Sequence, residues 1–225
     1  MPTATVSSVR RAATQVRERI TAAGGDPERV ALLAVTKGFG PEVAQTALTA
    51  GLLDLGENYA QDLVAKAELL GDADPAPRWS FIGRLQRNKV KLLAPHVGLW
   101  QSVDRSELGA EIARRAPGAA VLVQVDPRDE PQKGGCAPHA VPELVEQLGI
   151  LGLDVRGLMA VGPTPEDDLP LDAASRAFES VAELADRLDL PERSMGMSDD
   201  LEAAVAAGST MIRVGRGLFG DRPRR

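Results

Sequence analysis

Short apolar runs alternate with longer amphipathic segments along most of this chain. Short runs bounded by Gly, Pro or polar residues are typical of buried strands, and segments with apolar residues three or four positions apart are typical of helices. The pattern predicts strands at residues 31–36, 52–55, 79–82, 99–103, 120–125, 155–160, 193–195 and 211–214. It predicts helices at residues 6–23, 41–50, 59–70, 85–93, 105–115, 140–148, 171–188 and 199–206.

Predicted strands that alternate with helices indicate a parallel sheet, because parallel neighbours need a crossover connection between them. For 225 residues, this order predicts an α/β fold with one domain over residues 1–225. That domain is a single (β/α)8 TIM-type barrel with an extra N-terminal helix at residues 6–23. A doubly wound open sheet is the alternative. It is disfavoured because the chain has neither a dinucleotide glycine fingerprint after the first strand nor a phosphate-binding loop ending in Gly-Lys-Ser/Thr.

A barrel of this kind has its functional site at the carboxyl ends of its strands. The residues at these positions include a lysine, an amide, a serine and glycines. They are Lys37 after the first strand, Asn58 after the second, Met159 near the end of the sixth, Ser198 after the seventh and Gly215 after the eighth. We expect these residues to meet at the mouth of the barrel.

Lys37 is the most informative of these positions. It follows the apolar run 31–36 and precedes Gly38 and Pro41, which mark a turn. Burial at the edge of an apolar core disfavours the ammonium form, so the amine becomes more nucleophilic and suited to forming a Schiff base. Taken alone, a lysine at a strand end is more often solvent-exposed, so this interpretation depends on the other residues.

Two motifs after the closing strands predict a phosphate site. Ser198 is predicted as the N-cap of the helix at 199–206, and Gly215 and Arg216 begin a turn after the last strand. The loops after the seventh and eighth strands are the usual phosphate position in these barrels, where backbone N–H groups at a helix start face the anion. We expect Ser198 and the amides near Gly215 and Arg216 to hold one phosphate.

Arg213 lies two residues before Gly215 in the eighth strand, so its side chain is expected to point inward near the mouth. A lysine and a phosphate site across one barrel mouth suggest pyridoxal 5′-phosphate (PLP), which needs an amine for its aldehyde and an anion site for its phosphate. Because a guanidinium only donates hydrogen bonds, Arg213 would donate to an unprotonated pyridine nitrogen. The ring would then be a weak electron sink.

Seven stretches of the chain together resemble the pyridoxal phosphate homeostasis protein family, whose members are similar to the barrel domain of alanine racemase without its second domain. They are LAVTK at 33–37, LGENY at 55–59, FIGRLQRNK at 81–89, VDR at 103–105, RGLMA at 156–160, MGMSDD at 195–200 and MIRVG at 211–215. The resemblance implies that PLP is held as a covalent aldimine to Lys37. It implies further cofactor-binding residues, which are Asn58, Met159, Ser198, Arg213, Gly215 and Arg216.

The family is associated with control of free PLP and of amino-acid and keto-acid pools. The resemblance therefore implies a PLP homeostasis protein without robust turnover, whose further partners would be PLP-dependent apo-enzymes met transiently. A PLP-dependent amino-acid racemase is the alternative, but it needs a second acid or base, for which the chain offers only Tyr59, His96, His139 and Cys136. No metal site is predicted, because two histidines are too few for a metal-dependent hydrolase.

Composition narrows the setting of the protein. A formal net charge of −6 argues against a nucleic-acid partner. The single cysteine fits a reducing compartment, and neither a secretory signal nor an apolar stretch of membrane-spanning length occurs. These features predict a cytoplasmic protein, and the missing second domain favours a monomer. Lys133 is interpreted as an exposed loop lysine rather than a second cofactor-binding amine, and residues 222–225 as a disordered tail.

Overall fold

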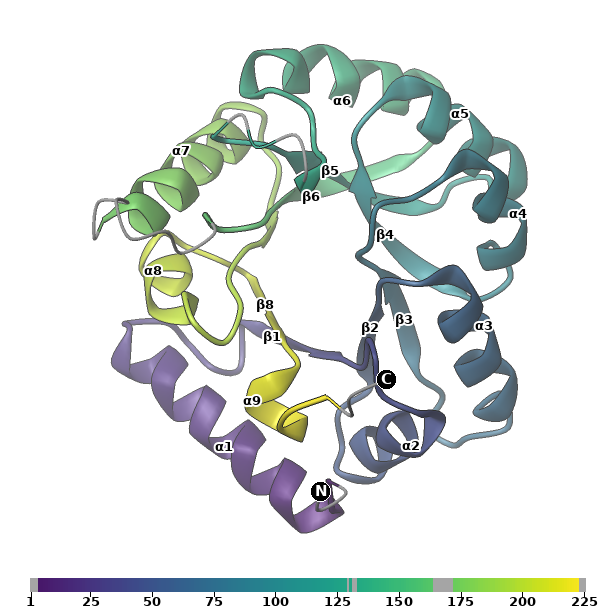
Figure 1. Cartoon of the computed structure of the whole chain (residues 1–225). Coiled ribbons are helices and arrows are strands. Elements are labelled where there is room, and N and C mark those ends of the chain that lie inside the picture. The colour runs from purple at the N-terminus through teal and green to yellow at the C-terminus, as the bar shows by residue number, and fades with distance from the viewer. Residues whose placement is uncertain (1–3, 129, 131–132, 164–171, 223–225) are drawn as a thin grey trace.

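Eight parallel strands form a closed barrel with the helices on its outside (Figure 1). This computed structural model describes residues 4–128, 130, 133–163 and 172–222. Parallel pairing of β1 with β8 closes the barrel, with Leu33 opposite Arg213. The predicted (β/α)8 barrel is therefore confirmed. The strands are β1 (Ala31–Val35), β2 (Asp54–Glu57), β3 (Arg78–Phe81), β4 (Val97–Val103), β5 (Ala120–Val125), β6 (Asp154–Ala160), β7 (Glu192–Ser194) and β8 (Met211–Val214).

Helices connect successive strands, and two of them differ from the prediction. The helix predicted at 85–93 is replaced by a short 3-10 turn and a single α-turn, because the backbone at Gln86 is extended. The helix predicted at 199–206 begins later, at Leu201. The helices are α1 (Val6–Ala22), α2 (Pro41–Thr49), α3 (Ala60–Leu69), η1 (Arg87–Lys89), α4 (Val90–Leu93), α5 (Ser106–Arg115), η3 (Pro138–Ala140), α6 (Val141–Ile150), α7 (Ala173–Arg187), α8 (Leu201–Ala206) and α9 (Arg216–Phe219).

The strands bury side chains on both of their faces. Leu32 and Ala34 of β1 belong to the large apolar cluster that packs the barrel against its helices. Leu33 lies between them and is fully buried, yet it is not part of that cluster. Successive side chains of a strand point to opposite faces, so Leu33 points into the barrel. Burial on both faces explains why these strands are continuous apolar runs rather than alternating ones.

The N-terminal helix α1 covers one side of the barrel beside α9 (Figure 1). Its first turn is fixed by a capping box, in which the Thr5 and Ser8 side chains each accept from the other residue's backbone N–H. Its buried residues recur every three or four positions, as an amphipathic helix requires. They are Val9, Ala13, Val16 and Ile20. The predicted extra helix is confirmed.

A buried ion pair joins β2 to α3 beneath the mouth of the barrel. Glu57 and Lys66 are almost completely buried, and the Lys66 ammonium donates to the Glu57 carboxylate and, at 2.9 Å, to the backbone carbonyl of Thr36. The Thr36 hydroxyl also donates to Glu57, at 2.9 Å. Because Thr36 directly precedes Lys37, this network holds the start of the turn that carries the lysine. The apolar pattern gave no indication of it.

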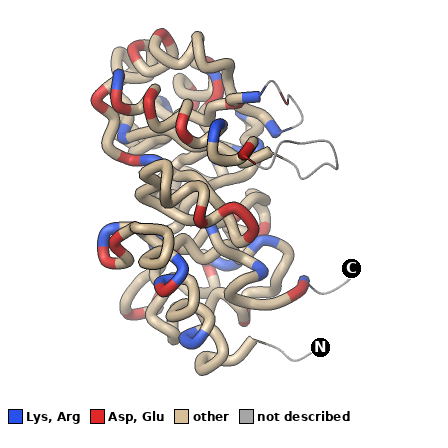
Figure 2. Tube along the Cα trace, turned by 90° about the vertical axis from the view of Figure 1, so that its left-hand side faces the viewer, with Lys and Arg blue, Asp and Glu red and all other residues tan. Residues whose placement is uncertain are grey.

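Charged residues of both signs are interspersed along the chain in the side view of Figure 2. In the part of the chain that the structure describes, no helix combines the length and the apolar character needed to cross a membrane.

We expect Lys66→Met to lower the free energy of unfolding by about 3–5 kcal/mol, because it leaves the buried Glu57 carboxylate without its counter-charge. Urea denaturation followed by circular dichroism measures this loss. Arg78→Ala is the matched control, since it removes one partner of the exposed Arg78–Asp54 pair and should cost less than about 1 kcal/mol. Equal losses in the two variants would contradict the role given to the buried pair.

Candidate functional site

A cavity of about 430 Å3 opens at the carboxyl ends of the strands. A parallel barrel brings all of these strand ends to one rim, so residues from distant parts of the sequence meet there. Each residue that the motifs proposed for the site lies in the wall of this one cavity. They are Lys37, Asn58, Met159, Ser198, Arg213, Gly215 and Arg216.

Lys37 lies in the turn directly after β1. The next residue, Gly38, has a φ of +76°, and a Cβ atom there would lie 2.9 Å from the Cδ atom of Arg222, so the turn favours glycine twice over. Burial lowers the pKa of the Lys37 amine, and the positive charges of Arg222 and Arg213 lower it further. The amine makes no hydrogen bond or ion pair with any described residue, which leaves it available to a ligand.

Arg213 points from β8 into the barrel beneath the cavity. Its guanidinium donates to the backbone carbonyl and the hydroxyl of Ser194, the latter at 2.8 Å, and to the carbonyl of Ala160 at 2.6 Å. Burial lowers the pKa of Arg213 to about 10, so the group remains a cation at neutral pH. No carboxylate of the described residues pairs with it, and not all of its five N–H groups are used. It is therefore a cation that still has unpaired N–H donors.

The prediction that Ser198 caps the following helix is wrong. Asp200 occupies the N-cap position of α8, and its carboxylate accepts from the backbone N–H of Met197 at 2.6 Å. This bond keeps residues 197–200 in a turn, so the helix starts only at Leu201. The Ser198 hydroxyl is left without a hydrogen-bond partner among the described residues. It faces α9, where a Cβ atom on Gly217 would lie 3.2 Å from the serine oxygen.

Arg216 contributes differently from Arg213. Its exposed guanidinium pairs with the carboxylate of Asp199 at 2.5 Å. The backbone N–H groups of Arg216 and Gly217 stand in the first turn of α9, where a helix supplies no internal partners. Beside the Ser198 hydroxyl, this end of the cavity therefore offers main-chain donors rather than a free arginine side chain.

Helix α1 holds the loop that carries Ser198. The Arg19 guanidinium donates to the backbone carbonyl of Ser198 at 2.9 Å and makes two bonds to the Glu202 carboxylate, at 2.6 and 2.8 Å. A bidentate pair of this kind fixes the direction of the guanidinium. The helix outside the barrel thus has a connection to the site that the sequence did not reveal.

Asn58, which follows β2, and Met159, in β6, line the cavity from opposite sides of the barrel. The backbone N–H of Asn58 donates to the buried Glu57 carboxylate at 3.0 Å, which ties Asn58 to the network beneath the turn. The side-chain oxygen of Asn58 is buried without a hydrogen-bond partner, so it would accept from a donor on a ligand. Met159 is buried near the end of β6 and gives the wall an apolar surface.

Comparison with known proteins identifies the family. Residues 10–223 match the family described as alanine racemase, N-terminal domain. The chain is 41% identical to the pyridoxal phosphate homeostasis protein of Pseudomonas aeruginosa, with 96% of this chain and 94% of that protein covered. It is 37% identical to the protein of the same name from Escherichia coli, with 92% and 94% covered. The chain belongs to the pyridoxal phosphate homeostasis protein family. The resemblance inferred from the motifs is confirmed.

Solved structures show the same fold in this family. PipY of Synechococcus elongatus, with PLP bound, has a TM-score of 0.76 and 32% identity, over 91% of this chain and all of PipY. A protein of Bifidobacterium adolescentis has a TM-score of 0.86 and 31% identity, over 95% of each chain. Alanine racemase of Clostridium difficile, at 15% identity and a TM-score of 0.75, shares the fold over 60% of its length.

The cavity of this family member contains cations that the motifs did not assign. Arg222 lies in the wall beside Lys37, although the sequence predicted a disordered tail from this residue on; residues 223–225 lie outside the described residues. Lys133 is also in the wall rather than exposed. Its amine bonds to the carbonyl of Gly162 at 2.8 Å and to the Glu130 carboxylate at 2.5 Å. Both come from loops, whose path the apolar pattern does not predict.

The side chains considered for a second acid or base do not line this cavity. Tyr59 is exposed and lines a separate groove, His139 lines a neighbouring pocket, and His96 precedes β4. Burial raises the pKa of the Cys136 thiol to about 11, so the thiol is protonated at neutral pH. Among the described residues, no group of three or more His, Cys, Asp or Glu side chains could hold a metal ion.

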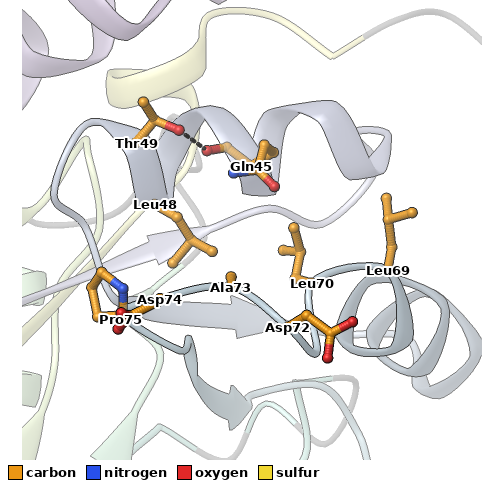
Figure 3. A pocket seen from close by; sticks show the side chains of 9 residues that line it. All are labelled: Gln45, Leu48, Thr49, Leu69, Leu70, Asp72, Ala73, Asp74 and Pro75. Carbon is orange, nitrogen blue, oxygen red and sulfur yellow. Dashed lines mark hydrogen bonds between the residues drawn. The ribbon is translucent and has the colours of Figure 1, made fainter.

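A second cavity, of about 560 Å3, lies between α2 and the segment that follows α3 (Figure 3). Its wall contains Leu48 and Leu70, and its charged residues are the carboxylates Asp72 and Asp74. The wall contains neither a cation nor a nucleophilic amine. It therefore does not suit the phosphorylated ligand that the motifs indicated, and the cavity at the barrel mouth is the candidate site.

We expect Lys37 to react with neutral amine reagents at lower pH than the exposed Lys91, since burial and two arginines lower the pKa of Lys37. Competitive labelling of the apo-protein over a pH series, read by peptide mass spectrometry, measures the two midpoints. Arg222→Ala removes one cation and should move the Lys37 midpoint to higher pH. Arg216→Ala is the control, because the Arg216 charge is already paired with Asp199. A Lys37 midpoint equal to that of Lys91 would contradict the expected shift.

Proposed function

We propose that this protein binds PLP covalently through Lys37 and serves in PLP homeostasis, as the names of its relatives state for them. The observation that carries the proposal is the amine of Lys37. It has a lowered pKa and no partner among the described residues, and it faces the same cavity as a buried guanidinium and an unpaired serine hydroxyl. The structure of PipY with PLP bound, from a protein 32% identical, supports it.

The residues of the cavity fit the three functional groups of PLP. Lys37 suits the aldehyde. The Ser198 hydroxyl and the N–H groups of Arg216 and Gly217, which follow Gly215, suit the phosphate, and Arg213 suits the pyridine nitrogen. The buried oxygen of Asn58 would accept from a ligand hydroxyl. When bound, this cofactor supplies a conjugated ring that can withdraw electrons from an attached amino acid.

Lys37 acts in its uncharged form. In that form the amine nitrogen would hold the cofactor through its aldehyde carbon, and the cofactor would supply that electrophilic carbon. A lowered pKa raises the uncharged fraction of the amine at neutral pH, so the chain prepares its own nucleophile before a ligand arrives. The Lys66–Glu57 pair, bonded to the Thr36 carbonyl, holds the start of the turn that carries this amine.

Arg213 favours binding of the cofactor over catalysis with it. A guanidinium cannot accept a proton, so it leaves the ring nitrogen unprotonated and the ring a weak electron sink. We therefore propose a cofactor-holding protein without robust catalysis. The racemase alternative has one observation in its favour, the second amine of Lys133 in the cavity wall, but that amine is engaged by Glu130. Transfer to apo-enzymes, a cytoplasmic location and a monomeric state remain predictions.

The first test is the visible absorption of the purified protein mixed with PLP. We expect a yellow band that Lys37→Ala abolishes and that borohydride reduction fixes to the peptide containing Lys37. Lys133→Ala is the control and should keep the band. A protein that stays colourless with PLP would refute the proposal, and a band fixed to another lysine would refute the role of Lys37.

The phosphate role of Ser198 has a separate readout. Ser198→Ala removes a donor to a charged group, so we expect about tenfold weaker binding of PLP, while binding of pyridoxal, which lacks the phosphate, changes little. Absorption titrations give both dissociation constants. If both ligands lose affinity equally, Ser198 does not contact the phosphate.

A racemase assay separates the two functions. Incubation of the PLP-loaded protein with L-alanine in deuterated water, followed by chiral chromatography, should give no D-alanine beyond the amount formed by free PLP. Steady production of D-alanine that Lys37→Ala abolishes would favour the racemase alternative instead.

A further inference from the structure

A chain of hydrogen bonds crosses the interior of the barrel below the cavity. It joins Gln101 of β4, Ser194 of β7 and Arg213 of β8. Gln101 and Ser194 are 0% exposed and Arg213 is 4% exposed. Buried polar groups of this kind are costly unless they are paired, so the arrangement needs a reason.

The chemistry of these three side chains decides which atom donates and which accepts in each hydrogen bond. The guanidinium of Arg213 only donates, so the Ser194 oxygen accepts from its Nη1 atom at 2.8 Å. The serine proton then goes to the Oε1 atom of Gln101 at 2.7 Å. The amide nitrogen of Gln101 faces the sulfur of Met211 at 3.2 Å, which orients the amide. Each member thus fixes the orientation of the next.

The same bonds fix the guanidinium at two of its nitrogens. Nη1 donates to the hydroxyl and the carbonyl of Ser194, and Nη2 donates to the carbonyl of Ala160 at 2.6 Å. The planar group therefore cannot rotate without breaking several bonds, and its remaining N–H groups keep one direction. Since Arg213 lines the cavity, those donors are available to a ligand there.

We infer that Ser194 and Gln101 are positioning residues, which hold the Arg213 guanidinium so that it donates to an unprotonated ring nitrogen of the bound ligand. The inference rests on the proposed function, because it takes PLP as that ligand. Without the Ser194 hydroxyl, Nη1 loses an acceptor and Gln101 loses its donor. The guanidinium can then shift toward other acceptors, and its bond to the ring nitrogen weakens.

The matched pair of variants is Ser194→Ala and Ser209→Ala. Each removes the hydroxyl of a buried serine, Ser194 in β7 and Ser209 just before β8. The Ser209 hydroxyl bonds to the Met195 carbonyl at 2.8 Å and makes no hydrogen bond to Arg213. If Ser194 has only a structural role, both variants should lose similar stability and neither should change the affinity for PLP. If Ser194 positions Arg213, only Ser194→Ala should change the affinity for PLP.

The experiment compares PLP with its analogue in which C–H replaces the ring nitrogen, by absorption titration and by the pH dependence of the bound band. We expect Ser194→Ala to bind PLP about tenfold more weakly, with a shifted midpoint pH, and to bind the analogue as the unaltered protein does. Ser209→Ala should match the unaltered protein in both. Equal loss for the two ligands, or no loss for PLP, would overturn the inference.

Two further arms keep the test decisive. If Ser194→Ala does not fold, Gln101→Leu interrupts the same chain one step further from Arg213, and we expect about threefold weaker PLP binding with the analogue unaffected. Ser194→Thr retains a hydroxyl and should restore PLP binding. Failure of the unaltered protein to bind PLP would instead refute the proposed function, which distinguishes the two outcomes.

Discussion

The pairing of β1 with β8 is the contact on which the candidate site depends. It places Leu33 opposite Arg213 and Ala34 opposite Val214, so the turn that carries Lys37 lies beside the loop that carries Gly215. The amine and the guanidinium come from opposite ends of the chain and become neighbours only when the barrel closes. The same closure brings the remaining strand ends to one rim, and these supply the rest of the wall.

Electrostatics at the mouth differ from the balance of the whole chain. The protein has a formal net charge of −6, yet Lys37, Arg213 and Arg222 lie together in the cavity wall. Burial of Lys37 and repulsion from the charges of Arg222 and Arg213 lower the pKa of its amine. An anionic ligand would reduce the repulsion between these cations. A phosphorylated aldehyde therefore suits the site, because its phosphate supplies negative charge and its aldehyde reacts with the uncharged amine.

The site is supported by buried polar networks below it and by a helix outside it. Glu57, Lys66 and Thr36 hold the lysine turn, and the Gln101–Ser194 chain holds the guanidinium. On the outside, Arg19 holds the loop of Ser198 from α1. Each of these contacts fixes a short loop or turn of the site. The loops can therefore hold functional side chains at fixed positions although they contain little secondary structure.

The sequence alone determined the barrel and the identity of the main site residues. Buried strands are continuous apolar runs, and the residues that follow them stand at one rim of any parallel barrel, so Lys37, Ser198 and Arg213 were predictable from their place after or within a run. Tertiary structure alone decided the supports and the loops. The pairing of Lys66 with the Thr36 carbonyl, the Gln101–Ser194 hydrogen bond and the place of Arg222 depend on contacts between residues far apart in sequence. Such contacts leave no periodic pattern, because periodicity records only which face of an element is buried and not what it meets there.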